Sequence, residues 1–415
     1  MKRKGLLIIG LLLIAATASF ALSGKVDFIT FWAGGVEADA TEAIIAAFNK
    51  VYPDVKITVI PKPSDNLMTS INLNLSSSAP VDAFMFWGGP GLKPLVDAGF
   101  VAPLTDIFKQ INYDKIAQGV KSQSRFADTG DTPWCLPITT GTFQVFYNMN
   151  VWKAAGLGDK DIPRTWDQLL AVAKKIKASG VAPFVRNVET AGTPARAWME
   201  KLIDRTAGAE YTDALASGKA SFDDPRFRKA DALWDQLRPY WHPDVGVMQY
   251  NEAYMAFARG QAAMQLIGSW IIGSYQTEMG LVPGKDYSAF AFPSIDPKVT
   301  QYETYFTGNA VVLSKSGAKS EAAKAFIAFW GTVEAQQIFA KFVPGLVAIE
   351  SVKYDSPILA VIAKELAGRP THMMFVGDTT IETDMMKLWE KRALGMTSPE
   401  EAIKQLVKLQ QSVKK

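Results

Sequence analysis

After the N-terminal segment, the first seventy-five residues alternate between strand-like and helix-like stretches. Residues 26–32 are apolar and rich in β-formers, and residues 55–59 alternate apolar with polar side chains, so both are predicted strands. Between them, residues 40–51 place apolar side chains on one helical face, and Pro53 ends that helix. Helix, strand and short helix are then predicted at 66–75, 81–87 and 90–98. This order is typical of a parallel α/β sheet.

Local helix-start signals organise the rest of the chain. Thr165 and Gln168 have the spacing of a capping box, which predicts a helix over 169–178. Ser398-Pro399-Glu400-Glu401 combines an N-cap serine with the proline and glutamate of a first turn, and so starts the last helix. Further helices are predicted at 225–237, 251–259, 320–329 and 333–342, and further strands at 142–148 and 310–313. The fold class is therefore predicted to be α/β.

Length and charge limit the number of domains and the kinds of partner. The 415 residues exceed one usual hydrophobic core, so two domains are expected. No low-complexity linker separates them, which indicates that the chain passes between the domains more than once. The formal net charge is +3, and Lys2, Arg3 and Lys4 supply three positive charges, so the remaining chain is close to neutral. Nucleic acid and anionic membranes are therefore not expected as partners.

The N-terminus has the three parts of a secretion signal. Basic residues at 2–4 precede an apolar stretch at 6–18, and Ser19-Phe20-Ala21 offers a small-x-small cleavage site. Residues 1–21 are therefore predicted to be a signal peptide, cleaved after Ala21 or Ala18, and the mature protein is expected to be periplasmic. The only cysteine is Cys135, so neither an N-terminal lipid anchor nor an intrachain disulfide is expected.

Residues suited to catalysis or metal binding are sparse. His242 and His372 are the only histidines and lie far apart in sequence, so no spacing matches a zinc site. Asp223 and Asp224 before Pro225 fit the start of a helix better than a calcium loop. No P-loop, dinucleotide fingerprint or G-x-S-x-G elbow occurs. The sequence therefore predicts a binding protein with no catalytic residues, no metal and no cofactor.

Three tryptophans follow strand-like segments directly. Trp32, Trp87 and Trp270 each end or follow an apolar run, and each has a glycine within two residues. Indole is flat and apolar with one hydrogen-bond donor, so it fits the face of a sugar ring. Ligands of open α/β sheets bind beyond the carboxyl ends of the strands, where Trp32 and Trp87 are expected. An exported protein with this pattern is predicted to bind a small polar solute, with sugars favoured.

Several segments occur in a characteristic order. The most specific block is Phe257–Met264 followed by Gly268-Ser269-Trp270. The others are 48–57, 83–87, 95–104, 136–138, 146–148, 322–326, 334–336 and 398–403. Their order and spacing resemble the family 1 extracellular solute-binding proteins of ABC importers, whose best-known member is maltose-binding protein. The resemblance covers essentially the whole chain after the signal peptide.

This resemblance implies a periplasmic binding protein type II fold, in which hinge crossings join two α/β lobes with a ligand cleft between them. Lobe one would comprise residues 26–139 plus 293–329, and lobe two residues 140–289 plus 330–415. The protein would be the substrate-binding subunit of an ABC transporter and a monomer. It would close on a sugar or polyol and deliver it to permease subunits in the inner membrane.

The same resemblance suggests ligand contacts, because Trp87 and Trp270 match sugar-stacking positions of the family. The remaining candidates are Trp32, Gly35, Glu37, Asp65, Asn66, Arg186, Asn187, Glu189, Trp241, Gly268 and Asp378. Residues 88–91 are Gly-Gly-Pro-Gly where maltose-binding protein has an acid and an arginine, and Gly141 replaces a ligand-binding glutamate. Both departures argue against maltose itself. Packing roles are predicted for Trp152, Trp166, Trp234, Trp330 and Trp389.

Two alternatives stay open at the level of sequence. A protein of this kind could bind a non-sugar solute, such as a glycerol phosphodiester or a polyamine, whereas ferric iron fits poorly with two histidines. A secreted carbohydrate-active enzyme is the alternative from another class, because 41 acidic residues always permit some pair of carboxylates. Turnover of a sugar, rather than its binding, would distinguish the enzyme.

Overall fold

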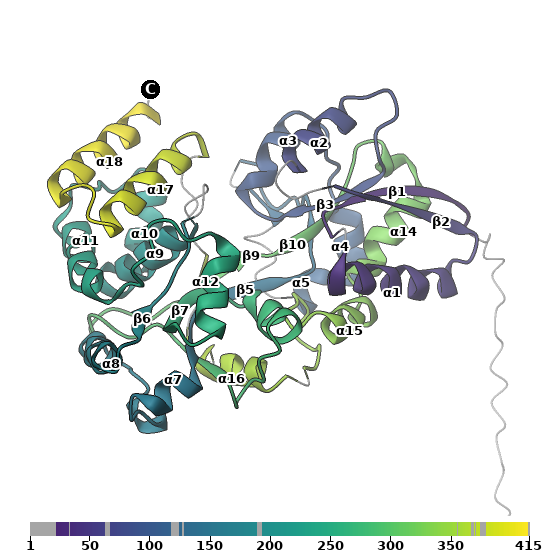
Figure 1. The fold of residues 1–415 in the computed structure, drawn as a ribbon. Helices are drawn as coiled ribbons and strands as arrows, with labels where there is room; N and C mark the ends of the chain where they lie inside the picture. The colour runs from purple at the N-terminus through teal and green to yellow at the C-terminus, as the bar shows by residue number, and fades with distance from the viewer. Residues whose placement is uncertain are drawn as a thin grey trace, which may run out of the picture.

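The computed structural model describes residues 22–32, 34–62, 67–117, 124–126, 128–188, 193–354, 356–366, 369, 371–373 and 379–413. The predicted signal peptide at 1–21 lies outside these residues. The chain forms two β-sheets, each surrounded by helices, which occupy the right and left halves of Figure 1.

The first sheet has the strand order β2-β1-β3-β10-β4. Its strands are β1 (Gly24–Thr30), β2 (Val55–Pro61), β3 (Ala83–Trp87), β4 (Leu136–Pro137) and β10 (Asn309–Leu313). β1 pairs in parallel with β2 and β3, which confirms the prediction for this part of the chain. β10 runs antiparallel to β3 and β4, so the sheet is mixed rather than parallel throughout. The difference arises because β10 comes from a distant part of the chain and not through a βαβ unit.

The second sheet has the order β11-β9-β5-β7-β6, and β8 also pairs with β5. Its strands are β5 (Thr140–Asn148), β6 (Ala182–Phe184), β7 (Ala262–Gly268), β8 (Tyr287–Phe290), β9 (Glu303–Thr307) and β11 (Thr371–Met373). β5 is antiparallel to β7, β8 and β9, whereas β6 is parallel to β7. β5 is buried along its whole length. Its pairing with β7, β8 and β9 connects the two parts of this sheet.

Helices cover both sheets. Around the first sheet they are α1 (Gly35–Val51), α2 (Leu67–Leu75), α3 (Lys93–Asp97), α4 (Thr105–Ile111), α5 (Tyr113–Ile116), α14 (Glu321–Trp330) and α15 (Val333–Phe342). Around the second they are α7 (Met149–Ala154), α8 (Trp166–Ala178), α9 (Thr193–Ala207), α10 (Ala209–Ala216), α11 (Pro225–Leu237), α12 (Tyr250–Ala258), α13 (Ile271–Gly273), α16 (Pro357–Leu366), α17 (Thr379–Ala393) and α18 (Pro399–Val413). Single turns lie at η2 (Pro90–Leu92), η3 (Asp159–Asp161), η4 (Arg238–Tyr240), η5 (Ser274–Glu278) and η6 (Gly317–Lys319). In the described part of the chain, none of the helices combines the length and apolarity needed to cross a membrane.

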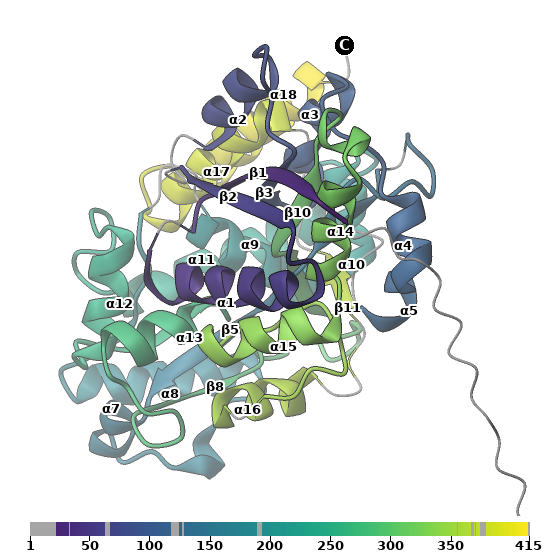
Figure 2. The ribbon, with the colours of Figure 1, turned by 90° about the vertical axis from the view of Figure 1, so that its right-hand side faces the viewer.

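The first sheet has a hydrophobic core on each face. Phe28 and Met85 belong to the core beneath α1, α14 and α15, whereas Ile29 and Phe84 belong to the core beneath α2 and α3. Successive side chains of a strand point to opposite faces, so the apolar runs in β1 and β3 supply both cores. Figure 2 shows α1 and α15 packed side by side on one face. This arrangement gives three layers of helix, sheet and helix.

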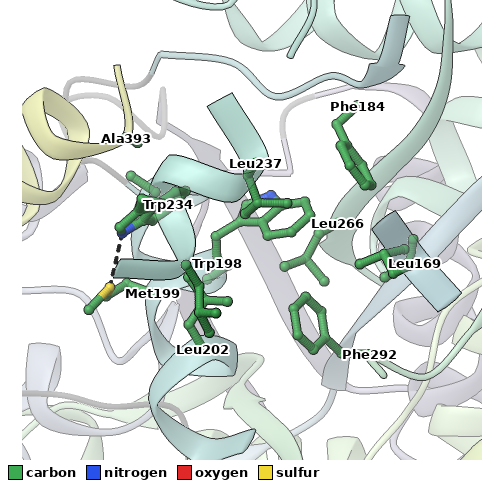
Figure 3. Packing of buried hydrophobic residues seen from close by; sticks show 14 of the residues in the cluster. Leu169, Phe184, Trp198, Met199, Leu202, Trp234, Leu237, Leu266, Phe292 and Ala393 are labelled. Atoms are coloured by element: carbon green, nitrogen blue, oxygen red, sulfur yellow. Dashed lines mark hydrogen bonds between the residues drawn. The ribbon is translucent and has the colours of Figure 1, made fainter. Parts of the chain in front are cut away.

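The core of the second half centres on α9 and α11 (Figure 3). Trp198 and Trp234 are fully buried there, and the Trp234 indole donates to the Met199 sulfur at 3.1 Å. The packing role predicted for Trp234 is therefore confirmed. Buried positions also confirm the packing roles of Trp152, Trp166, Trp330 and Trp389.

Local sequence signals end and start the helices as predicted. Thr165 and Gln168 form the capping box of α8, and the Asp224 side chain caps α11. Gly99 has φ +71° directly after α3, and the amide that follows it donates back to a carbonyl of that helix at 3.1 Å. A left-handed glycine of this kind satisfies carbonyls that a helix end leaves free.

Two segments that pass between the sheets are hydrogen bonded to each other. Residues 138–139 connect β4 to β5, and Gly308 connects β9 to β10. The Ile138 amide donates to the Asn309 carbonyl at 2.8 Å, and the Asn309 amide donates to Thr139 Oγ1 at 2.7 Å. The two crossings therefore form one paired ribbon.

A third crossing follows α15 and packs against the first. The Thr140 amide donates to the Leu346 carbonyl at 3.0 Å, and the Ala348 amide donates to the Ile138 carbonyl at 3.1 Å. From there the chain continues to α16, which packs on β8 of the second sheet. The sheets are thus joined by three adjacent backbone segments.

We predict that Gly308→Ala destabilises the protein by about 1–3 kcal/mol, because a Cβ at this position would lie 2.2 Å from the Thr139 carbonyl oxygen. The matched control is Gly345→Ala in the third crossing, where a Cβ has no neighbour within 4 Å. Urea denaturation of both variants measures the effect. Equal stability of the two variants would show that the crossings are not tightly packed at Gly308.

Candidate functional site

Trp87 is the last residue of β3 and lies on an aromatic neighbour. Its ring stacks on Phe31, with centroids 5.2 Å apart and an angle of 29° between the planes. Phe86 contacts it edge to face at 5.2 Å. Trp87 still keeps 39% of its surface exposed. One side of the indole is therefore supported by protein, and the other remains open for an apolar partner.

Trp270 has an equivalent arrangement beyond β7. Its indole lies directly over Gly268, because a Cβ built on Gly268 would fall 1.8 Å from the ring. The Trp270 Nε1 donates to the Tyr250 hydroxyl at 3.0 Å, and Phe143 contacts the ring edge to face at 5.4 Å. Trp270 keeps 41% of its surface exposed. The absence of a side chain at residue 268 is thus what lets the ring lie flat.

Both tryptophans border the crossing segments, and they come from different sheets. Trp87 is paired with Asn309 across β3 and β10, next to Gly308. Gly268 is paired with Phe143 in β5, which starts just after the first crossing. We define the strand ends that carry Trp87 and Trp270 as the candidate site. A ligand held beside the crossings would contact both sheets there.

Trp32, Gly35 and Glu37 lie beyond the end of β1. Trp32 is only 8% exposed, because its ring stacks on Phe339 of α15 at 4.9 Å. Gly35 is exposed with φ +68°, and it begins α1 five residues earlier than predicted. Glu37 lies in the first turn of that helix and is partly exposed. Of these three, Trp32 is held mainly by packing, whereas the other two face solvent.

Arg186, Asn187 and Trp241 gather at the end of β6. The Arg186 Nη1 donates to Glu390 Oε2 at 2.6 Å, and its guanidinium lies over the Trp241 ring, 5.3 Å from the centroid. Arg186, Asn187 and Trp241 are 1%, 2% and 9% exposed. The structure therefore brings these three predicted residues together with Glu390, which the sequence analysis did not identify. Asp65, Asn66, Glu189 and Asp378 lie outside the described residues.

Three neighbours of the predicted residues were missed. Phe31 supports Trp87, Tyr250 accepts from Trp270, and Glu390 pairs with Arg186. Phe31 and Trp32 are adjacent in the sequence, so an aromatic pair could be recognised there. The sequence did not show that Phe31, rather than Trp32, contacts Trp87. Tyr250 and Glu390 carry no sequence signal, because their partners are 20 and 204 residues away.

A buried ionic network on α9 fixes the first residue of β9. Glu303 accepts from Arg205 Nη2 at 2.7 Å, from Lys201 Nζ at 3.3 Å and from Arg369 Nη1 at 2.9 Å. Burial lowers the pKa of Lys201 and of Arg205. Arg205 also donates to the backbone carbonyls of Phe292 and Tyr302. These contacts hold β9 against α9, with the Glu303 carboxylate as the acceptor shared by three cations.

Glu200 on the same helix is a buried carboxyl with an altered pKa. Arg196 Nε donates to it at 3.0 Å, but desolvation dominates and raises the pKa of Glu200 to about 8. The folded protein therefore favours the protonated carboxyl near neutral pH.

A separate groove of about 1180 Å³ opens between α17 and α18 and contains none of the predicted site residues. Apolar side chains such as Leu388, Ile403 and Val407 line it together with charged ones. Across the described ranges, no group of three or more histidine, cysteine or acidic side chains is placed to hold a metal ion.

The two sheets, the three crossings and the exposed aromatic strand ends define a solute-binding architecture. The family model for bacterial extracellular solute-binding proteins matches residues 34–337. The chain belongs to this family.

Named relatives agree with this assignment. An ABC transporter extracellular-binding protein of Pyrococcus horikoshii is 27% identical over 394 residues, which is 89% of this chain and 86% of that protein. The multiple sugar-binding protein of Streptococcus mutans is 26% identical over 397 residues, or 91% and 89% of the two chains. A solved chitin oligosaccharide binding protein has a TM-score of 0.80 at 20% identity and covers 94% of this chain and 98% of its own. The fold is that of the type II periplasmic solute-binding proteins, as predicted.

We predict that Gly268→Ala perturbs the protein only through Trp270. The three atoms nearest to an added Cβ all belong to the Trp270 ring, so the substitution should displace the indole and cost about 1–3 kcal/mol. In a Trp270→Ala background the same change should be close to neutral. A double-mutant cycle on chemical denaturation measures this coupling. Additive effects would contradict the flat placement of the ring.

We predict that Glu200→Gln changes the dependence of stability on pH. The folded pKa of about 8 lies above the ordinary 4.5, so the contribution of the protonated carboxyl is present below pH 4.5 and is lost as pH rises through 8. The variant should be more stable than the parent at pH 8 by about 1 kcal/mol or more, with a smaller difference at pH 5. Thermal unfolding from pH 5 to 9 measures the effect. Parallel profiles would show that Glu200 does not titrate in this range.

Proposed function

We propose that this protein captures a sugar or a sugar-like solute (a mono- or oligosaccharide, or a polyol) and delivers it to the permease of an ABC transporter. The observation that carries the proposal is the pair of exposed tryptophans on two sheets. Trp87 rests on Phe31 and Trp270 rests on Gly268, and they keep 39% and 41% of their surfaces exposed. Flat apolar faces of this kind suit the C–H faces of sugar rings. The relatives named for sugars support the same ligand class.

We further propose that capture involves closure of two lobes around the crossings. Ligand contacts made from both lobes would stabilise the closed arrangement, because only such contacts distinguish it from the open one. Lobe one would comprise residues 22–139 plus 308–352, and lobe two residues 140–307 plus 357–413. These lobe boundaries differ from the sequence-based ones at residues 293 and 330. β9 pairs with β5 of the second sheet, which supports placing it in lobe two. α15 packs on α1 of the first sheet, which supports placing it in lobe one.

The location and partners are part of the proposal. The family acts outside the cytoplasm, and the N-terminal pattern supports a cleaved signal peptide and a periplasmic mature protein. The only cysteine, Cys135, lies far from the predicted cleavage site, which supports a protein without an N-terminal lipid. We propose that the protein acts as a monomer toward its ligand, binds no nucleic acid and catalyses no reaction.

One measurement distinguishes each alternative, the non-sugar ligand and the carbohydrate-active enzyme, from this proposal. A glycerol phosphodiester or polyamine ligand would bind without any sugar competing for the site. A secreted carbohydrate-active enzyme would convert the bound sugar to new products on prolonged incubation.

We predict that Trp270→Ala weakens sugar binding by about 1–3 kcal/mol while the apo protein stays folded, because it removes a stacking surface rather than core volume. A thermal-shift screen of galactose, raffinose, xylotriose and chitobiose first identifies a ligand, since a bound ligand raises the melting temperature. Calorimetry then compares affinities, with about −8 kcal/mol expected for a micromolar site. Saturating ligand should also lower the radius of gyration in solution scattering.

The matched control is Trp234→Ala, which removes a fully buried indole. It should cost about 3–5 kcal/mol of stability and leave the site intact. If Trp270→Ala destabilised the apo protein and left affinity unchanged, the assignment of Trp270 to the site would be wrong.

A further inference from the structure

Buried polar atoms without a hydrogen-bond partner gather beyond the end of β6. They are Arg186 Nε and Nη2, Asn187 Nδ2, Trp241 Nε1 and Glu390 Oε1. Buried polar atoms are almost always paired, because leaving one unpaired costs its full desolvation. Five such atoms in contacting residues indicate a site that is completed by polar groups from outside the chain. We call these four residues the β6 cluster.

The topology places the β6 cluster after the strand that neighbours β7, and β7 leads to Trp270. β6 and β7 are parallel neighbours that run toward the same edge of the sheet. β6 ends at Phe184, opposite Met264, whereas β7 runs on to Gly268 and is followed by Trp270. Parallel strands of α/β sheets present ligand contacts at this edge. The β6 cluster and the tryptophan thus belong to adjacent strand ends.

A second connection runs through the loop after β6. The Val188 amide donates to the Met248 carbonyl at 2.8 Å, two residues before Tyr250. Tyr250 in turn accepts from the Trp270 indole. The backbone that leaves Arg186 and Asn187 is therefore tied to the segment that supports Trp270.

The charges of the β6 cluster compensate each other. Arg186 Nη1 is bound to Glu390 Oε2 at 2.6 Å, so the guanidinium and the carboxylate form an ion pair. What remains unpaired is the Nε and Nη2 edge of the guanidinium, the Asn187 amide donor, the Trp241 indole N–H and one carboxylate oxygen of Glu390. These are donors and an acceptor together, with no net charge.

This combination distinguishes between ligand classes. A hydroxyl group both donates and accepts, so neighbouring hydroxyls can accept from Arg186 and Asn187 and donate to Glu390. A phosphate dianion or a carboxylate only accepts, and it would meet the carboxylate oxygen of Glu390 at close range. Arginine without such a partner would instead favour an anion.

We propose that Arg186, Asn187 and Glu390 bind neighbouring hydroxyl groups of an uncharged carbohydrate, and that Glu390 selects against anionic ligands. The inference rests on the proposed function and specifies its ligand class. Trp270 covers a face of the sugar, and the β6 cluster holds hydroxyls at its rim. The unpaired atoms are closed to solvent in this conformation, whereas the Glu390 side chain is 13% exposed. Binding therefore includes a local opening at Glu390.

The test compares Glu390→Gln with the parent by isothermal titration calorimetry. The probes are galactose, raffinose, xylotriose and chitobiose as uncharged ligands, and sn-glycerol 3-phosphate as the anion. We expect the parent to bind at least one uncharged probe more tightly than the anion. In Glu390→Gln the Kd for that probe should rise at least tenfold, and the preference over sn-glycerol 3-phosphate should narrow.

The matched control is Asp231→Asn. Asp231 accepts from Arg392 at 2.8 Å in a buried ion pair that involves the same helix, α17, but not the β6 cluster. It should leave the Kd within twofold of the parent. If Glu390→Gln fails to fold, Asn187→Ala replaces it, because that change removes a neutral donor, leaves the ion pair intact and should likewise raise the Kd at least tenfold.

Two results would overturn this inference but not the proposed function. The first is an unchanged Kd in Glu390→Gln, or in Asn187→Ala if that variant replaces it, while Trp270→Ala still weakens sugar binding. The second is a parent protein that binds both a sugar and sn-glycerol 3-phosphate, with the anion bound more tightly. A parent that binds none of the uncharged probes would overturn the inference and the proposed function together.

Discussion

The hydrogen-bonded contact among the three crossing segments is the constraint on which the rest of the molecule depends. The amides of Ile138, Thr140 and Asn309 all donate hydrogen bonds within this small region. Thr139 can lie close to Gly308 because Gly308 has no side chain. Any movement of one sheet relative to the other must therefore occur at a few peptides that are hydrogen bonded to each other. This connection favours a hinge motion over a shear motion of the two sheets. The strand ends that carry Trp87 and Trp270 pair with residues close to these crossings. A small bend at the crossings would therefore change the distance between the two tryptophans directly.

Much of the fold was predictable because its first half is local. In α1 the apolar periodicity of the sequence coincides with the buried face at Ile44, Ala47 and Phe48, although Val51 at the helix end is exposed. The caps at Thr165 and Gly99 mark helix ends by chemistry within a few residues. The antiparallel entry of β10 was not predictable, since its pairing with β3 joins residues more than two hundred positions apart. Helix α9 was missed for a different reason: Glu200 and Arg205 give it a polar ridge, and that ridge is buried by Glu303 and Arg369 from far along the chain.

The position of the candidate site could be predicted in part. Trp87 and Trp270 lie at or just beyond strand ends, each within two residues of a glycine, and both are exposed as stacking on a ligand would require. Trp32 shares that pattern, yet its ring turns inward onto Phe339 while the adjacent Phe31 turns outward onto Trp87. Consecutive residues leaving a strand point to opposite sides, so the choice between them depends on where α15 packs and not on the local sequence. Glu390 was invisible for a similar reason, because only the folded chain brings α17 to the end of β6.

The distribution of charge explains how capture and release can coexist in one site. Lys201 and Arg205 of α9 are buried against Glu303, and Arg186 is paired with Glu390, so these carboxylates weaken the field that the three cations present to a ligand. In the proposed site, recognition would then depend on ring stacking and hydroxyl hydrogen bonds, whose energies vanish when the groups separate by a few ångströms. A charged ligand held by Coulomb attraction would still be attracted after such a separation. A neutral ligand bound from both sheets, as proposed, would instead lose its contacts once the crossings bend open, and this is the behaviour that a delivery protein needs.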